Sequence, residues 1–315
     1  NVLFPDGASN TNITLAGGNL APASITFPAN ATGYTLTASG ANQITGTTSV
    51  VKTGTGLLTM AGANAYTGGT TLSKGETRVR TAGTLGTSTV TLGDANTGTN
   101  NVALYLDTNR VNFGTAVVVT NNGTGTMTLG SRSTVTGNGD NNQFTNITLQ
   151  RDVIFDSNAT DRTDYENIAG TGNIRVTGDG RTVFPNANTF VGNLTIATSA
   201  DASGLQLGTN SAPFNAIPDA SNVTVEAGGK LSLSYTANGT ETISGLFGAG
   251  TVRNNGGNAN TLIVGGNNGS GNFSGSIVNG SSPAVAFGLT KNGSGTQTLS
   301  GSASSYTGLT TINAG

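Results

Sequence analysis

The chain has 315 residues, of which 49 are glycine and only 9% are charged, and its formal charge is −2. Its lysines and arginines are scattered, which argues against a nucleic-acid surface because such surfaces cluster cations against phosphates. No run approaches the roughly 18 apolar residues of a membrane-spanning helix. We therefore expect neither a nucleic-acid partner nor a helical membrane span.

Histidine and cysteine are both absent. Ser-His-Asp and Cys-His catalytic sites therefore cannot form, and nearly all transition-metal sites are excluded. Any catalysis would have to use carboxylates or elimination assisted by arginine or lysine. We expect no cofactor.

Short strands of alternating polar and apolar residues are predicted along the whole chain, separated by Gly, Asn and Pro turns. Thr, Val and Ile are frequent in these runs and suit pleated strands. No stretch has an apolar helical period with caps, so we predict essentially no helix. In chain order the main predicted strands are 12–15, 23–27, 34–37, 89–92, 102–106, 116–120, 126–129, 144–149, 173–177, 222–226, 231–235, 251–253 and 261–264.

One motif occurs three times. Residues 51–77 contain a Gly-x-Gly turn, a short strand, an Asn-rich corner with one aromatic residue, and a Thr-Thr-Leu strand. Residues 289–315 repeat this motif, and a degenerate copy lies near 177–197. Such self-similarity indicates a stacked repeat architecture. The matched positions are Lys52 with Lys291, Gly54 with Gly293 and Gly178, and Tyr66 with Tyr306 and Phe190.

Residues 52–72 and 289–315 resemble the autotransporter-associated β-strand repeat, which occurs in long passenger regions of bacterial surface proteins. The resemblance implies a right-handed parallel β-helix that is exported and displayed outside the cell. We predict one all-β solenoid segment over residues 1–315, with about 20–25 residues per turn. A sandwich or an up-and-down barrel would also fit the strand spacing, but the recurring motif and the scarcity of two-residue hairpin signals favour the solenoid.

Charged residues gather in the segment 151–166. Two of its carboxylates could cleave a glycosidic bond if they lay about 5–10 Å apart. Three of them could supply oxygens to Ca²⁺. A solvated loop with locally paired charges, such as Arg162 near Asp161, explains the segment more simply, so we predict no catalytic, ligand-binding or metal residue. The charged residues are Arg151, Asp152, Asp156, Asp161, Arg162, Asp164 and Glu166, of which Asp156, Asp161 and Asp164 are the catalytic candidates, and Asp161, Asp164 and Glu166 the metal candidates.

Two further features have competing interpretations. Arg78 and Arg80 put two cations on one strand face, as in some polysaccharide lyases, but we favour an ordinary outer face as the explanation. Tyr66, Phe190 and Tyr306 occupy equivalent places in the motif and could form a sugar-stacking row. We predict instead that each aromatic ring packs against its own corner.

These observations predict a non-enzymatic structural segment of a bacterial extracellular or cell-surface protein, as a stalk or a fibre element. The alternatives are a polysaccharide-active β-helix, acting as a lyase or a hydrolase, and a glycan-binding adhesin. The expected partners are copies of the chain or adjacent solenoid repeats, with glycans or neighbouring cells as further candidates. Both ends have strand-like sequence without a polar cap, so we expect the chain to belong to something longer or to stack end to end.

Overall fold

The computed structural model describes residues 1–80, 84–108, 111–132, 141–158, 162–198, 204–208, 215–234, 239–280 and 285–315. Within these residues the chain is all-β, and its one helical element is the short 3₁₀ turn η1 (Gly266–Asn268). The named strands pair in parallel, as β5 and β7 do in the first half and β26 and β29 in the second. The predicted parallel β-helix is confirmed, and the hairpin-based sandwich and barrel are not formed.

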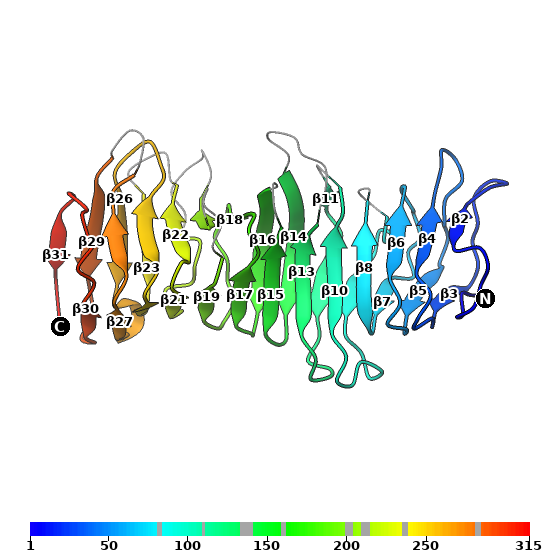
Figure 1. The fold of residues 1–315 in the computed structure, drawn as a ribbon, viewed down its shortest axis with the longest axis horizontal. Coiled ribbons are helices and arrows are strands. Elements are labelled where there is room, and N and C mark those ends of the chain that lie inside the picture. Colours follow the sequence, from blue (N-terminus) through cyan, green and yellow to red (C-terminus); the bar gives the residue numbers. More distant parts are fainter. Residues whose placement is uncertain are drawn as a thin grey trace. The chain divides into compact units, whose positions relative to one another are not determined.

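The chain divides into two compact units, Asn1–Ile154 and Phe155–Gly315. In the first unit, strands of two sheets follow one another alternately along most of the chain (Figure 1). One sheet contains β1 (Val2–Leu3), β3 (Ser24–Phe27), β5 (Ser49–Lys52), β7 (Thr70–Leu72), β9 (Val90–Leu92), β12 (Val117–Val119) and β14 (Asn141–Leu149), and β11 (Asn112–Phe113) also pairs with β14. The other sheet contains β2 (Asn12–Thr14), β4 (Tyr34–Thr37), β6 (Leu58–Ala61), β8 (Gly75–Val79), β10 (Val102–Leu106) and β13 (Met127–Ser131).

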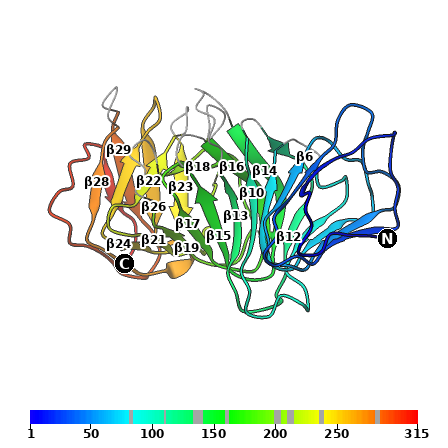
Figure 2. The same cartoon turned by 45° about the vertical axis from the view of Figure 1, so that its right-hand side comes forward.

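The second unit has three sheets, which we name I, II and III; β23, β26 and β29 of sheet III are labelled in Figure 2. Sheet I contains β16 (Arg162–Gly170), β18 (Arg181–Phe184), β20 (Leu205–Leu207), β22 (Lys230–Leu233), β25 (Thr251–Asn254) and β28 (Ser276–Val278). Sheet II contains β15 (Val153–Ser157), β17 (Ile174–Thr177), β19 (Leu194–Ile196), β21 (Val223–Val225), β24 (Leu246–Gly248), β27 (Gly271–Phe273) and β30 (Gln297–Leu299). Sheet III contains β23 (Thr240–Ile243), β26 (Asn260–Val264), β29 (Phe287–Lys291) and β31 (Thr310–Ile312).

Paired strands are one full turn of the solenoid apart in sequence. Val50 pairs with Thr70, 20 residues later, as a short turn of the coil. Val117 pairs with Ile147, 30 residues later, so some turns are longer than the predicted 20–25 residues.

The core is built from side chains that stack in register from one turn to the next. In the first unit, Leu36, Met60, Val79 and Leu106 follow one another across β4, β6, β8 and β10, and all are at most 2% exposed. Alternate residues point to opposite faces of a strand, so their neighbours lie on the outer surface. Each buried aliphatic side chain stabilises the fold by roughly 1.5–3 kcal/mol. This is the continuous inner stack that the alternating sequence pattern predicts.

Candidate functional site

The recurring motif builds a corner of the coil. In each copy, the polar residue two places before the aromatic one accepts a hydrogen bond from a main-chain N–H of the preceding turn. This acceptor satisfies an N–H group that a bend would otherwise leave unpaired. The three bonds run from Ile44 N to Asn64 Oδ1 (2.9 Å), from Ile168 N to Asn188 Oδ1 (2.8 Å) and from Ile277 N to Ser304 Oγ (3.1 Å).

Two of these acceptors also reach forward. The amide of Asn64 donates to the Thr84 carbonyl at 3.0 Å, and that of Asn188 donates to the Ala216 carbonyl at 2.8 Å. A single asparagine therefore bridges three successive turns of the coil.

A glycine two places after the aromatic residue completes the corner. A Cβ atom at Gly68, Gly192 or Gly308 would lie between 2.1 and 2.4 Å from a main-chain oxygen of the preceding turn. No side chain can occupy that space, so the glycine is required by close backbone approach. The motif thus lets the backbone bend at the corner while it packs directly against the preceding turn of the coil.

The degenerate copy is not equivalent to the last copy in its sheets. After its Gly-x-Gly turn, the last copy continues into β30 of sheet II and then β31 of sheet III. The degenerate copy continues into β18 of sheet I and then β19 of sheet II. Phe190 and Tyr306 therefore hold the same place in the motif but lie at corners between different sheets, because the motif specifies a bend that any corner can use.

The motif aromatics pack into these corners. Tyr66 is 0% exposed and Phe190 is 1% exposed, so neither offers a ring face to a sugar. The Tyr66 hydroxyl lies 2.6 Å from Thr70 Oγ1, and the Tyr306 hydroxyl lies 2.8 Å from Thr310 Oγ1. Burial raises the pKa of Tyr66.

Sequence reasoning matched Lys52 with Lys291 but assigned them no role. The Lys52 ammonium, 1% exposed, donates to the carbonyls of Gly54 at 2.7 Å and Lys74 at 2.6 Å. Lys291 donates to the corresponding carbonyls of Gly293 at 2.9 Å and Ala314 at 3.2 Å. Burial lowers the pKa of Lys52 to about 8, with partial compensation from Glu76. The sequence did contain a signal for this carbonyl-capping role: a lysine recurs at the same position of the motif in a chain with few charged residues.

Arg151, at the start of the charged segment 151–166, also caps carbonyls. Its guanidinium donates to the main-chain oxygens of Asn122 at 3.1 Å, Gly123 at 2.7 Å and Gly125 at 2.8 Å. These oxygens belong to the turn before β13. Arg151 therefore has a structural role in the first unit.

The carboxylates of the segment are only partly brought together. Arg162 forms a two-pronged ion pair with Asp164, with Nη2 at 2.8 Å from Oδ2, and Asp156 accepts from Thr177 Oγ1 at 3.0 Å. Burial raises the pKa of Asp164, and this outweighs the opposing effect of Arg162. Asp161 lies outside the described residues, so its predicted pairing with Arg162 stays a prediction. In the described ranges, no three His, Cys, Asp or Glu side chains are grouped as metal ligands.

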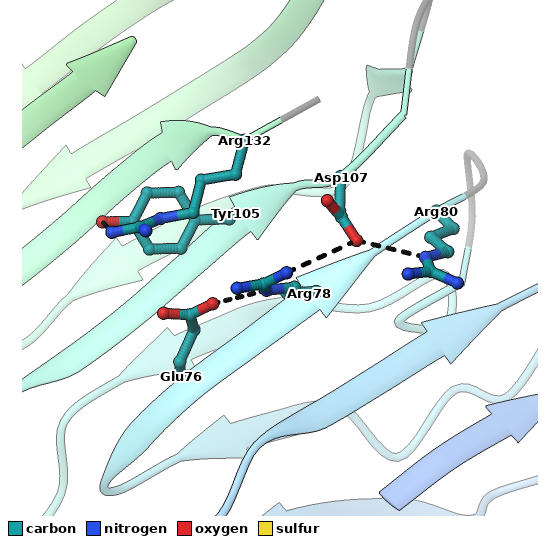
Figure 3. Close-up of polar contacts among 6 residues, drawn as sticks. All are labelled: Glu76, Arg78, Arg80, Tyr105, Asp107 and Arg132. Atoms are coloured by element: carbon teal, nitrogen blue, oxygen red, sulfur yellow. Dashed lines mark hydrogen bonds and ion pairs between the residues drawn. The ribbon is translucent and has the colours of Figure 1, made fainter. Parts of the chain in front are cut away.

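Arg78 and Arg80 form a charged network on the outer face of β8 and β10 (Figure 3). Arg80 Nε lies 3.1 Å from Asp107 Oδ2, Arg78 Nη1 lies 3.9 Å from the same oxygen, and Arg78 also pairs with Glu76. Close by, the Arg132 guanidinium lies 4.1 Å from the centre of the Tyr105 ring and donates to its hydroxyl at 2.9 Å. The two predicted cations are thus compensated by neighbouring acids, as an ordinary outer face would be.

Comparison with known proteins agrees with the repeat architecture. The passenger-associated-transport-repeat family matches residues 50–85 and 289–315. The adhesin BmaC autotransporter of Brucella suis biovar 1 (strain 1330) is 34% identical over 167 residues, which are 50% of this chain and 4% of that protein. The chain therefore spans a small fraction of that relative's length. No solved structure matches the chain.

Among the described residues, no helix is long and apolar enough to cross a membrane. The two matched stretches coincide with the motif copies that form coil corners in the structure. The repeats and the adhesin relative together imply a location at the bacterial cell surface or outside the cell. The chain thus contains two passenger-associated-transport repeats, and half of it is similar to part of an autotransporter adhesin.

Proposed function

We propose that the chain is a non-enzymatic structural segment of a passenger, acting as a stalk. The observation that carries this proposal is the corner itself, in which each motif copy bonds to the turn before it. A chain that binds its own preceding turn at every copy can be extended without a separate core, as repeat proteins are. Such a stalk would hold other parts of its protein away from the cell.

The state of the candidate catalytic residues supports a non-enzymatic role. Asp164 is only 5% exposed and is held by both prongs of Arg162. A general acid or a nucleophile must reach its substrate directly or through one water molecule. Asp164 is poorly placed for either role, and Asp156 is already bonded to Thr177.

An adhesive role is the second candidate, because the matched relative is named an adhesin. A stalk and an adhesive surface are compatible, since a solenoid can present its outer faces along its whole length. The two roles differ in what they require: a stalk needs only stability, whereas an adhesin needs a surface with a defined ligand.

The stalk proposal is tested by mechanical unfolding of the purified chain combined with turnover assays on polygalacturonate and alginate. We expect the chain to resist force and to unravel in steps that correspond to single turns. We also expect no release of reducing or unsaturated sugar ends above a blank. Turnover that disappears in Asp164→Asn would contradict the proposal and favour the polysaccharide-active alternative.

A further inference from the structure

Asn-Gly pairs recur along the chain, and their surroundings differ. An asparagine followed by glycine can react with itself, because the main-chain nitrogen of the glycine can reach the side-chain carbon of the asparagine without hindrance from a Cβ atom. The pairs that lie wholly within the described residues are Asn122-Gly123, Asn255-Gly256, Asn268-Gly269, Asn279-Gly280 and Asn292-Gly293. The structure separates these pairs by the state of the groups that would react.

The attacking group is the glycine N–H, and in three of these pairs it already donates a hydrogen bond. The three bonds run from Gly256 N to Asn254 Oδ1 (2.9 Å), from Gly269 N to the Gly266 carbonyl (3.0 Å) and from Gly280 N to the Val285 carbonyl (3.2 Å). Within the described ranges, the N–H groups of Gly123 and Gly293 donate no hydrogen bond. These two nitrogens can therefore lose a proton without breaking a bond of the fold.

A cation contacts the carbonyl of each of these two amides. Lys291 Nζ donates to the Asn292 carbonyl at 2.6 Å, and Arg151 Nη1 donates to the Asn122 carbonyl at 3.1 Å. When an amide nitrogen loses its proton, its carbonyl oxygen shares the negative charge, because both atoms belong to one conjugated peptide unit. A charge-assisted hydrogen bond to that oxygen therefore stabilises the anionic nucleophile. The Lys291 contact is the shorter one, so it should activate its amide more strongly.

The side-chain amide of Asn292 is activated as well. Its Oδ1 accepts a hydrogen bond from Asn313 Nδ2 at 2.7 Å. Negative charge develops on Oδ1 when the glycine nitrogen adds to Cγ, and a donor that is already in place stabilises this charge. In the first copy of the motif, Thr53 stands where Asn292 stands in the last copy, and threonine has no amide group to lose.

We propose that Asn292 deamidates spontaneously in the folded chain and that Asn122 is a second, slower site. Gly293 N gives its proton to hydroxide or a buffer base and adds to Asn292 Cγ. The Cγ–Nδ2 bond then breaks, Nδ2 takes a proton from water and leaves as ammonia, and a succinimide ring remains. Water opens the ring at either carbonyl, which gives aspartate or isoaspartate.

The product changes the corner that Lys291 holds. The Lys291 ammonium donates to the main-chain carbonyls of Asn292, Gly293 and Ala314. Each deamidation replaces a neutral amide next to this ammonium by a carboxylate. Isoaspartate also adds a methylene group to the main chain. The reaction is therefore a slow, one-way change in the charge and backbone path of this motif copy, and it goes beyond the stalk role.

The test follows deamidation at each asparagine by peptide mapping and mass spectrometry during incubation of the whole chain in neutral buffer. Asn268, Asn279 and Asn292 are matched, because each is followed by Gly-Ser. In the folded chain we expect Asn292 to react at least tenfold faster than Asn268 or Asn279, and Asn122 to react faster than either. In concentrated urea the three matched asparagines should react within twofold of one another, because the fold no longer distinguishes them.

Substitution of the cation separates activation from simple exposure. Lys291→Met should slow the reaction at Asn292 at least threefold, whereas Lys291→Arg should keep most of the rate because it restores the charge. Arg175→Gln is the control: Arg175 pairs with Glu226, and its loss should leave the rate at Asn292 unchanged.

Thermal unfolding verifies that each variant is folded. If Lys291→Met fails to fold, Arg151→Gln makes the same test at Asn122, with Arg151→Lys as the variant that restores the charge. Equal rates at the three matched asparagines of the folded chain would overturn the proposal. An unchanged or faster reaction after removal of the cation would overturn it as well.

Discussion

The first and last copies of the motif have the same local bonds but very different burial. In both, the lysine caps two carbonyls and the tyrosine hydroxyl meets a threonine. Leu72 of the first copy is 1% exposed, whereas its counterpart Ile312 in the last copy is 71% exposed. The difference is the following turn: Leu72 pairs with Leu92 of the turn after it, whereas among the described residues Ile312 pairs with Lys291 of the turn before it.

The comparison separates two contributions to the stability of the repeat. Bonds within the motif and to the preceding turn fix the corner, and both copies have them. Burial of the apolar face depends on the following turn, which covers only the first copy in this structure. Substitutions at matched positions can therefore separate two contributions to stability. One comes from bonds within the motif and to the preceding turn, and the other comes from burial under the following turn.

The two copies should differ most in the stability lost when the aliphatic residue at the end of the Thr-Thr-Leu or Thr-Thr-Ile strand is replaced. Leu72→Ala should lower the free energy of unfolding by about 3 kcal/mol, because it removes a buried side chain and leaves a cavity. Ile312→Ala should change it by less than about 0.5 kcal/mol, because Ile312 is exposed. Chemical denaturation of both variants measures this. Equal losses would contradict the comparison.

The corner glycines should behave alike in the two copies, because both face the preceding turn. A Cβ atom at Gly68 would lie 2.4 Å from the Thr47 oxygen, and one at Gly308 would lie 2.2 Å from the Phe287 oxygen. Gly68→Ala and Gly308→Ala should each cost about 2–3 kcal/mol or unfold the local turn. Gly257→Ala is the control, since a Cβ there meets no atom within 4 Å. A neutral Gly308→Ala would show that the last corner is not closed.

Stability should rise with pH between about 8 and 10 because of Lys52. Its pKa is about 8 in the folded chain, compared with 10.5 for an ordinary lysine, so the unfolded chain binds more protons in this interval. The free energy of unfolding then increases by about 2 kcal/mol from pH 8 to pH 10. Above that range the raised pKa of Tyr66 acts in the opposite direction.

Denaturation curves at several pH values, for the unchanged chain and for Lys52→Met, measure this slope. The variant should lose the slope, because methionine fills the same space without a titrating group. A slope that persists in Lys52→Met would assign the effect to another residue.

The smallest expected effect concerns the tyrosine hydroxyls. Tyr66→Phe should cost about 1 kcal/mol, since it removes a buried hydrogen bond to Thr70. Tyr306→Phe should cost less, because its bond to Thr310 is exposed and water can replace it. Thermal unfolding of the two variants side by side tests the order, and a larger loss for Tyr306→Phe would reverse the interpretation.

Much of the fold could be predicted from the sequence. The alternation of Val, Leu and Ile with Thr and Ser located the strands, and the recurring motif indicated parallel stacking. The corner role of Tyr66 also followed, because an aromatic beside Asn64 and Gly68 recurs at fixed spacing. These features are local, so a short window of sequence contains them.

Features that depend on register across turns could not be predicted. The partner of Asn64 is Ile44, 20 residues earlier and outside the motif. The sheets that the degenerate copy joins depend on the lengths of the connections before it, and the motif itself contains no information about those lengths.

The central claim is that successive turns lie in parallel, in register, one strand apart. It is tested most directly by cysteine cross-linking, since the chain has no native cysteine. Thr71 pairs with Thr91, and Thr91 with Val118, on the outer surface of β7, β9 and β12. Thr71→Cys with Thr91→Cys should form an intramolecular disulfide on mild oxidation, because paired strands lie about 4.8 Å apart. Thr71→Cys with Val118→Cys, two strands apart, should not, and cross-linking of this second pair without the first would contradict the stacked solenoid.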